Sequence, residues 1–417
     1  MQLTSLFVDF DAYFASAEQH LQPHLRGLAV GVAPVLAETS CCIAASYEAK
    51  ARGIKTGTSV RDARKLCPGI VIVEARPAEY VELHHRLVAA VESCIHVEAV
   101  LSIDEMWCWL PYNRRDPDTA QAIAQRIKQA VHDQVSPWIK ASVGVAPNRW
   151  LAKMASKMRK PDGLLIIEPQ HLPDILYEVD LRDMHGVGRA MELRLHAHGI
   201  HHSRSLCAAT RQQLHHAWGG IAGDQLWMQL RGQEIPEPTT ANARRSIGHS
   251  HVLPPEKRPP ENALPVLHKL TQKAAQRLRS YGMLTRRFHL SLRYLRGGQW
   301  EQEVTIDATD DSLMLARIAG QLWRERPQHG GHLLKVSMVL GKLTHAGNYT
   351  PSLFTDDGES AIHASPQNHQ VLNESMDKLV QKFGRQSIYL GGAHHAMEAA
   401  PMRISFGHIP DLEMESD

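Results

Sequence analysis

The sequence predicts an α+β fold built from more than one domain. Over residues 3–167, short apolar runs typical of strands alternate with amphipathic runs of helical period. Setting residues 24–75 aside except for the strand 70–74, the order is β, α, β, α, β, β, α, β, α, β. A helical segment and a proline-containing linker then lead to a second, basic α+β block. At 417 residues the chain is long enough for two to four domains. We therefore expect a sheet with helices on one face, and further domains attached to it.

The period of the apolar residues, 3.6 in a helix and 2 in a strand, assigns each element of the first part. In order, we expect strand 3–10, helix 11–20, short strands and a helix within 24–69, strand 70–74, helix 77–94, strands 97–103 and 106–110, helix 118–134, strand 139–145, helix 148–158 and strand 164–167. Residues 168–232 read as helical, and residues 233–242 carry two prolines and read as a linker. In the basic block we expect strands 246–253, 287–295 and 302–306 and helices near 262–281 and 311–324.

The composition excludes several classes of protein. No apolar run approaches the roughly 20 residues that a membrane span needs. The N-terminus has no charged region followed by an apolar one, so we expect no secretory signal. The six cysteines show no CxxC spacing, which favours reduced thiols and a cytoplasmic protein. The 26 histidines lack HExxH spacing and are interpreted as surface or core residues rather than metal ligands.

The net charge is only +2, but the charge is unevenly distributed. Residues 244–298 hold 12 Lys or Arg and 2 Asp or Glu, whereas residues 351–417 hold 4 and 10. A basic block in a nearly neutral chain indicates a polyanionic partner such as nucleic acid. A basic surface that merely faces solvent is the alternative.

Two acidic pairs follow apolar runs in distant parts of the chain. Asp104 and Glu105 lie between two apolar segments, and Asp9 and Asp11 end the first strand. Charged groups beside buried strands are costly unless a cation neutralises them. Oxygen-only ligands favour Mg²⁺, so the two pairs predict a divalent-metal site. Each pair alone could also be a solvated turn.

With these stretches laid out, the chain resembles the Y-family translesion DNA polymerases, the class of DNA polymerase IV and the polymerase V catalytic subunit. The resemblance covers residues 3–343 and depends on the order of several motifs. They are Val8–Phe14, Ser46–Ala49, Ser102–Glu105, Ser142–Ala146, Lys153–Ser156, Lys160–Gly163, Gly186–Gly188 and Arg245–Gly248. It implies a right-hand polymerase: palm 1–23 and 76–167, fingers 24–75, helical thumb 168–232 with a helix-hairpin-helix, linker 233–242, little finger 243–343 and tail 344–417.

By this resemblance, Asp9, Asp104 and Glu105 are expected to hold two Mg²⁺ ions, with the Phe10 carbonyl as a further ligand. A primer 3′-hydroxyl would attack the α-phosphorus of a dNTP and release pyrophosphate, chemistry that two cations can assist. Asp11 is interpreted as a structural residue.

The resemblance also assigns residues to the incoming nucleotide. Phe14 would be the steric gate that excludes a 2′-hydroxyl. The alternative is a core Phe on an amphipathic helix. Tyr47, Lys50 and Lys160 would bind the triphosphate, although the family usually carries Arg at position 50, which grips phosphate in a bidentate way that Lys cannot. Cys41 and Ile43 would form a loose roof over the new base pair.

The remaining expectations concern DNA and partner proteins. Gly186 and Gly188 would let the hairpin approach a DNA phosphate, although an ordinary helix-loop-helix fits the sequence equally well. Arg244, Arg245 and Ser246 would grip the template backbone. Leu353 and Phe354 are interpreted either as a sliding-clamp-binding peptide or as plain linker. The ordered block 371–409 has no assigned role. We expect a monomer that binds primer-template DNA and dNTPs and no membrane.

Three functions are compatible with these residues. The first is an error-prone, template-directed DNA polymerase. The second is an inactive Y-family-like adaptor that binds DNA and the clamp, which would have no need of the three carboxylates. The third, a nucleotide cyclase with a similar palm, is disfavoured by the hairpin and the basic C-terminal domain.

Overall fold

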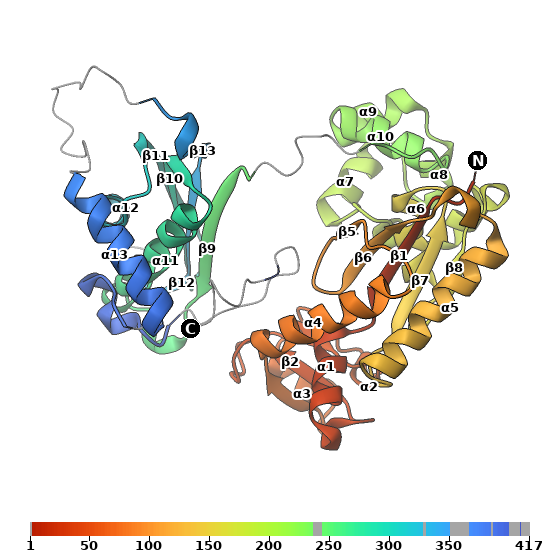
Figure 1. Ribbon diagram of the computed structural model, residues 1–417, viewed down its shortest axis with the longest axis horizontal. Helices are drawn as coiled ribbons and strands as arrows, with labels where there is room; N and C mark the ends of the chain where they lie inside the picture. The colour runs from red at the N-terminus through yellow and green to blue at the C-terminus, as the bar shows by residue number, and fades with distance from the viewer. Residues whose placement is uncertain are drawn as a thin grey trace. The chain divides into compact units, whose positions relative to one another are not determined.

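The computed structural model describes residues 2–236, 244–327, 331–350, 367–384, 387–399 and 409. The chain divides into two compact units, with the boundary between Glu237 and Pro238, inside the predicted linker. The described residues up to 236 form the first unit, and those from 244 to 399 form the second (Figure 1). Each unit is built around its own sheet and its own core.

The main sheet of the first unit has the strand order β5-β6-β1-β7-β8. Its strands are β5 (Ala99–Val100), β6 (Glu105–Trp109), β1 (Ser5–Phe10), β7 (Ala141–Ala146) and β8 (Leu164–Ile166). The central strand β1 pairs antiparallel with both β6 and β7. All six of its residues are buried, so both faces of the sheet are covered at this point.

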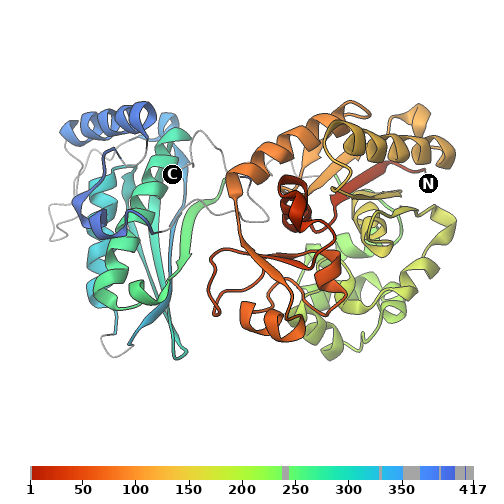
Figure 2. The ribbon, with the colours of Figure 1, turned by 90° about the horizontal axis from the view of Figure 1, so that it is seen from below.

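Helices lie on both faces of this sheet, so the expectation of helices on one face is wrong. Helices α4 (Pro77–Glu92) and α5 (Pro117–Gln134) run along one face, and α6 (Arg149–Met158) packs on the other (Figures 1 and 2). A glycine in β7 makes this close packing possible. A Cβ on Gly144 would lie 2.1 Å from the carbonyl oxygen of Ala152 in α6. Helix α6 is therefore held directly over the centre of the sheet.

A smaller sheet, with the order β3-β2-β4, is inserted after the first helix, α1 (Tyr13–Leu21). It consists of β2 (Val30–Ala33), β3 (Ala44–Ala45) and β4 (Val71–Glu74), with α2 (Tyr47–Lys50) and α3 (Val60–Leu66) packed beside it. Its small core contains Cys42, Ala45, Ile54 and Ala63. This subdomain falls within the range 24–75 that the sequence singled out.

Short helices follow the main sheet and complete the first unit. They are α7 (Arg189–Ala197), α8 (Ser203–Ala208), α9 (Arg211–Trp218) and α10 (Ile221–Gln229), preceded by three 3-10 turns between Pro169 and Asp183. Their apolar residues share one core with α6, including Trp150, Leu176 and Leu214. The side chain of Asn148 caps α6 and also donates to the carbonyl oxygens of Gln229 and Gln233. The helical region is therefore fixed to the sheet through α6.

The second unit has a four-stranded sheet in the order β11-β10-β12-β9, with β13 (Thr344–His345) paired to β10. The strands are β9 (Ser246–Val252), β10 (Met283–Tyr294), β11 (Gln299–Thr309) and β12 (Leu333–Gly341). Alternate residues of β10, namely Phe288, Leu290 and Leu292, are buried against α11 (Pro260–Ser280) and α12 (Ser312–Glu325). The opposite face of the sheet carries the partly exposed side chains of this strand.

A C-terminal helix, α13 (Gln367–Phe383), joins the second unit through polar contacts. Arg279 of α11 forms two hydrogen bonds with the Asp377 carboxylate, of 2.6 and 2.9 Å. Asp311, at the start of α12, accepts hydrogen bonds from His369 and Asn373. The ordered block that the sequence indicated at 371–409 is thus partly this helix, together with the 3-10 turn Gly391–Ala396.

One expected strand differs from the structure, and one strand of the structure was not expected. The strand expected at 97–103 is only Ala99–Val100, because Ser102 and the residues after it form the turn into β6. Strand β12 was not anticipated, although its buried residues alternate.

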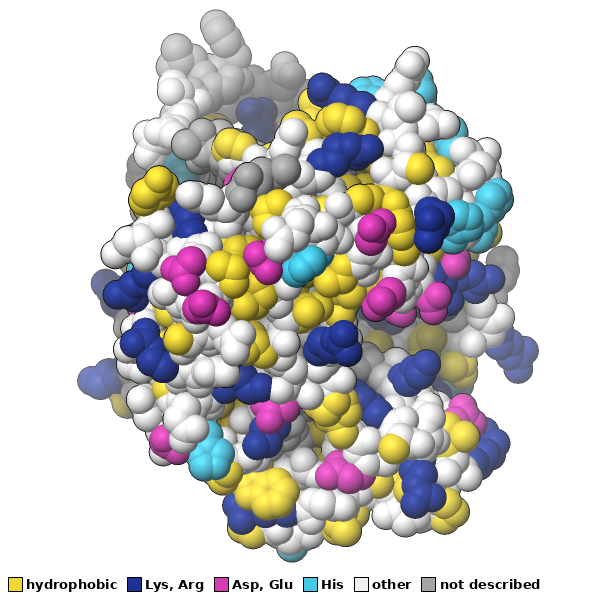
Figure 3. Space-filling model, turned by 90° about the vertical axis from the view of Figure 1, so that its right-hand side faces the viewer, with side chains coloured by type: hydrophobic (Ala, Val, Ile, Leu, Met, Phe, Trp, Pro, Cys, Tyr) yellow, Lys and Arg dark blue, Asp and Glu magenta, His cyan; other side chains and the backbone are white. Residues whose placement is uncertain are grey.

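None of the described helices is both long and apolar enough to cross a membrane. On the face shown in Figure 3, basic and acidic side chains are interspersed, in keeping with a nearly neutral chain.

Candidate active site

The two distant acidic pairs meet where strand β1 ends and the neighbouring strand β6 begins, as the sequence predicted. Asp9 on β1 is the direct register partner of Glu105 on β6. The backbone N–H of Phe10 donates to the carbonyl oxygen of Asp104 at 2.8 Å. Residues nearly 100 positions apart are therefore neighbours because β1 and β6 are paired.

Asp9 and Asp104 are held in an environment that disfavours their negative charge. Asp9 is 5% exposed. Its pKa is raised from 3.8 to about 6, mainly by burial and also by the negative charges of Asp104 and Glu105, against the opposing effect of Lys160. Burial also raises the pKa of Asp104, whose carboxylate accepts a 2.6 Å hydrogen bond from the Ser102 hydroxyl. The site therefore carries negative charge that a cation would stabilise.

Two lysines supply positive charge at this site. Lys160 donates to the Asp9 carboxylate, and Lys153 on α6 donates to Glu105 at 2.7 Å. In the ranges that the structure describes, no three acidic, histidine or cysteine side chains already converge as a set of metal ligands. The carboxylates suit a divalent cation because they are oxygen donors, are largely buried and repel one another. The ammonium groups of Lys160 and Lys153 neutralise part of their negative charge.

Asp11 organises the loop that carries Lys160. Its carboxylate accepts hydrogen bonds from the Ser142 hydroxyl at 2.8 Å and the backbone N–H of Asp162 at 2.7 Å. The Tyr47 hydroxyl donates to it at 3.3 Å, and the Lys160 ammonium lies 3.5 Å away. Asp11 is 1% exposed, so its partners compensate for its burial. These contacts account for the structural role expected of Asp11.

The residues expected to bind a triphosphate lie beside this group. Ser46 caps α2, which orients Tyr47 and Lys50. The Lys50 ammonium lies 4.3 Å from the centre of the Tyr47 ring. Burial and the nearby Lys160 lower the pKa of Lys50. Tyr47 is linked to Lys160 through Asp11, so the structure brings all three positions together.

The two roof positions lie in the smaller subdomain. Cys41 is exposed and forms an isolated β-bridge with Ser59. Ile43 is half-buried, and its backbone N–H donates to Val32. All six cysteines of the chain are unpaired thiols.

Phe14 is packed against a second aromatic ring. It is 2% exposed and stacks on Tyr80 of α4, with ring centres 4.9 Å apart and planes 20° from parallel. The Tyr80 hydroxyl donates to Glu18 at 2.7 Å, and Arg76 pairs with the same carboxylate. The position of the Phe14 ring is thus fixed by a neighbour that is itself held by the buried Glu18 carboxylate.

The glycine-rich hairpin leads into α7. Gly186 has a φ of +91°, which favours glycine, and Gly188 caps α7. The Trp150 indole N–H donates to the carbonyl oxygen of His185 in the same loop. No side chain in the described part of the protein caps the start of α7, so its first backbone N–H groups could donate to an anion.

The predicted DNA-binding residues of the second unit lie at the start of its sheet. The Arg244 guanidinium lies 4.0 Å from the centre of the Tyr281 ring, and Arg245 and Ser246 are exposed. Leu353 and Phe354 lie outside the described residues.

Two functional contacts were not anticipated from the sequence. Lys153 belongs to one of the family motifs, but its contact with Glu105 was not expected. The hydrogen bond from Ser102 to Asp104 was not expected either. The amphipathic pattern of α6 could have placed Lys153 toward the sheet, but its contact with Glu105 depends on how closely α6 approaches Gly144.

Comparison with known proteins now decides the family. Residues 8–157 match the impB/mucB/samB family, and residues 244–353 match the C-terminal domain of that family. DNA polymerase IV of Moorella thermoacetica is 35% identical over 292 residues, which cover 69% of this chain and 72% of that protein. DNA polymerase IV 1 of Bacillus subtilis is 31% identical over 415 residues, 96% of this chain and 95% of that protein.

The chain belongs to the Y family of DNA polymerases. Among solved structures, it resembles a Y-family chimera of Dbh and Dpo4, with 25% identity and a TM-score of 0.69 over 81% of this chain and 98% of that one. An insertion ternary complex of Dbh, 24% identical with a TM-score of 0.54 over the same shares, supports the fold. The multi-domain right-hand fold is thereby confirmed.

This Y-family chain is a DNA-directed DNA polymerase of translesion synthesis. The relatives do not favour the inactive adaptor. Y-family polymerases are metal-dependent enzymes. The buried carboxylates described above are the part of this chain that fits such a metal.

The raised pKa of Asp9 predicts a pH-dependent cost in the metal-free protein. Its pKa is about 6 when folded and 3.8 as the ordinary value. Because the folded protein holds the Asp9 proton more tightly than the unfolded chain, the stability of the fold is highest below pH 3.8. This contribution is lost as the pH rises through 6, where Asp9 must ionise in the folded protein. Two pKa units correspond to at most about 3 kcal/mol. We expect Asp9→Asn to raise the unfolding temperature in EDTA relative to wild type at pH 8.

The measurement is the difference in unfolding temperature between Asp9→Asn and wild type from pH 4.5 to 8. That difference should grow in favour of the variant through pH 6. A difference that stays constant over this range would show that the Asp9 charge is already compensated.

Proposed function

We propose that this polymerase adds dNMPs to a primer 3′ end by nucleotidyl transfer at Asp9, Asp104 and Glu105, and releases pyrophosphate. The observation that carries this assignment is the register of β1 and β6, which places Asp9 opposite Glu105. These three carboxylates, with the Phe10 carbonyl, would hold two Mg²⁺ ions. When bound, such ions supply charge stabilisation for the attacking and leaving oxygens.

The protein side of the reaction is mainly positioning. The β1–β6 pairing fixes the three carboxylates relative to one another before substrate arrives. Ser102 orients Asp104 by its 2.6 Å hydrogen bond. Electrostatic groups that are held in place in this way need no rearrangement during the reaction.

We assign the dNTP to the neighbouring group of polar residues. Tyr47 can donate a hydrogen bond to a phosphate, and Lys50 and Lys160 add positive charge. Phe14 lies under the sugar in this assignment and excludes a ribose. Cys41 and Ile43 cover the new base pair. Because both side chains make only a small contact with it, a damaged template base can still be accommodated.

The domain boundaries belong to the same proposal. The palm is 1–23 and 76–167, the fingers 24–75, the thumb 168–232, the linker 233–242, the little finger 243–343 and the tail 344–417. Gly186 and Gly188 bind primer-template backbone from the thumb. A sliding clamp would be recognised through Leu353 and Phe354, and the polymerase acts as a monomer.

Primer extension tests the assignment. The purified full chain, with Mg²⁺ and four dNTPs, should extend a primer in the order that the template dictates, and should continue past an abasic site. Binding of primer-template without any extension would favour the adaptor and overturn the proposal.

DNA binding by the little finger should depend steeply on salt. Phosphate contacts release counterions, so each one adds about −0.9 to the slope of log K against log salt. Because Arg244 and Arg245 are at the exposed start of β9, replacing both by alanine should reduce the magnitude of the slope by about 2. Fluorescence anisotropy with a labelled primer-template from 50 to 300 mM NaCl measures it.

Arg317→Ala is the matched control, since Arg317 is exposed on α12, on the helical side of the same sheet. It should leave the slope unchanged. A slope that is the same in wild type and in the double variant would contradict the assignment of Arg244 and Arg245.

A further inference from the structure

Helix α6 carries Lys153 and Lys157, and Lys160 follows two residues after its end. The three lysines differ in their contacts. Lys153 pairs with Glu105 and Lys160 pairs with Asp9. Lys157, between them in sequence, is exposed. Among the residues that the structure describes, it has no hydrogen-bond or ion-pair partner. One cation of this row is therefore available to an external anion.

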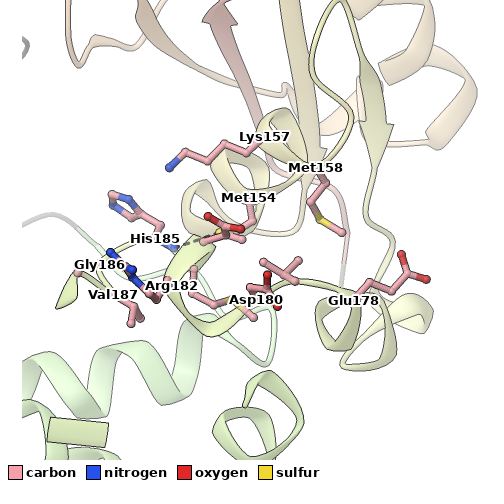
Figure 4. Close-up of a pocket in the computed structure, with 13 residues that line it drawn as sticks. Met154, Lys157, Met158, Glu178, Asp180, Arg182, His185, Gly186 and Val187 are labelled. Carbon is pink, nitrogen blue, oxygen red and sulfur yellow. Dashed lines mark hydrogen bonds between the residues drawn. The ribbon is translucent and has the colours of Figure 1, made fainter. Parts of the chain in front are cut away.

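Lys157 lies on the wall of a hollow of about 810 Å³ between α6 and the thumb. Its polar lining includes Lys157 from α6 and Arg182 and His185 from the thumb. The acidic residues Glu178, Asp180 and Asp183 line it as well. In Figure 4, Lys157, Arg182, His185 and Gly186 gather at one end of the hollow, and Glu178 lies at the other. The basic end is thus the end beside the glycine-rich hairpin.

The positive charges of neighbouring lysines act on His185 and on Lys157 at this end of the hollow. Burial, together with the charges of Lys153 and Lys157, lowers the pKa of His185 to about 4. Partial desolvation and the charge of Lys153 likewise lower the pKa of Lys157. Positive groups that disfavour one another in this way would be stabilised by a bound anion.

We propose that Lys157 binds a backbone phosphodiester of the primer strand between the hairpin and the carboxylates. The inference rests on the proposed function, because it assumes that the primer 3′ end reaches Asp9 and Glu105. A strand that also contacts the hairpin at Gly186 must pass along α6. Lys157 lies one turn of α6, about 6 Å along the helix, beyond Lys153, whose ammonium contacts Glu105.

The incoming triphosphate is the competing anion. Its proposed ligands, Tyr47 and Lys50, gather around Asp11 on the side of the site that faces the smaller subdomain. Lys157 instead shares its hollow with residues of the thumb. The geometry therefore favours the primer strand over the nucleotide.

Equilibrium binding of primer-template in EDTA, without dNTP, tests this without requiring catalysis. Lys157→Ala should reduce the magnitude of the salt slope by about 0.9, which is about an 8-fold loss of affinity at 0.1 M salt relative to a 1 M reference. Lys157→Arg should retain the wild-type slope, because it keeps the charge. Lys65→Ala, which removes an exposed lysine of α3, should also retain it.

Single methylphosphonate substitutions identify the strand. In wild type, a neutral linkage at the contacted primer phosphate should weaken binding, and in Lys157→Ala the same linkage should have no further effect. Because Lys157 is exposed, all variants should unfold at the wild-type temperature.

Three results would overturn the inference: an unchanged salt slope in Lys157→Ala, coupling of Lys157 to a template linkage instead of a primer linkage, or unchanged DNA affinity with a raised KM for dNTP. The last result would assign Lys157 to the triphosphate. Each leaves primer extension by wild type intact, so failure of this inference is distinguishable from failure of the proposed function.

Discussion

Replacing Asp104 by alanine is expected to reduce the rate of primer extension by about 10²–10³-fold or more, while DNA binding and the fold persist. Removing one preorganised electrostatic group from an active site costs about 10²–10³ in kcat. Asp104 lies in the turn before β6, and its backbone carbonyl oxygen, which accepts from Phe10, is unchanged by the substitution. The measurement is the single-turnover rate of dNMP addition at saturating DNA and dNTP.

Asp133→Ala is a suitable control, because Asp133 is an exposed acid on α5, which covers the opposite face of the sheet from α6. It should extend primers at the wild-type rate. A rate for Asp104→Ala within about 10-fold of wild type would mean that catalysis does not depend on this carboxylate.

Shortening Phe14 is expected to increase ribonucleotide incorporation relative to dNTP incorporation by about 10- to 100-fold. Forcing extra atoms into a packed site costs about 1–3 kcal/mol, which corresponds to this range of discrimination. The stacked Tyr80 ring, 4.9 Å away, prevents the Phe14 ring from moving aside for a 2′-hydroxyl. Competing rNTP and dNTP incorporation opposite one template base gives the ratio.

Because Phe14 is 2% exposed, Phe14→Ala also carries a stability cost of about 3–5 kcal/mol. Phe14→Leu is the second variant, since it opens the site with a smaller loss of packing. Phe14→Tyr should keep the wild-type selectivity. If both shortened variants remain folded and their selectivity is unchanged, Phe14 is a core residue and not a gate.

Local sequence patterns predicted most of the first unit because its elements have clear periods. The strand that ends at Phe10 and the helices α5 and α6 were placed within about three residues at each end. The strand expected at 97–103 was wrong because apolar residues continue into a turn, and periodicity does not distinguish these two cases. Strand β12 was overlooked, although Val336, Met338 and Leu340 alternate in burial.

The carboxylate pair was predictable, but its ion pairs were not. Asp9 and Glu105 follow apolar runs, and the resemblance to the Y-family polymerases assigns both to one metal site. The contact between Lys153 and Glu105 depends instead on tertiary packing, since α6 reaches the sheet only where Gly144 has no side chain. The same holds for Asp11, whose partners Ser142 and Asp162 come from separate segments.

The most direct test of the central claim is the number of Mn²⁺ ions bound at the three carboxylates, measured by electron paramagnetic resonance. A complex with a dideoxy-terminated primer, template and the correct dNTP should bind two Mn²⁺ ions per wild-type chain. Asp104→Ala and Asp9→Asn should bind fewer, or bind them more weakly, in the same complex. Unchanged stoichiometry and affinity in both variants would contradict the claim that these carboxylates jointly hold the catalytic metal ions.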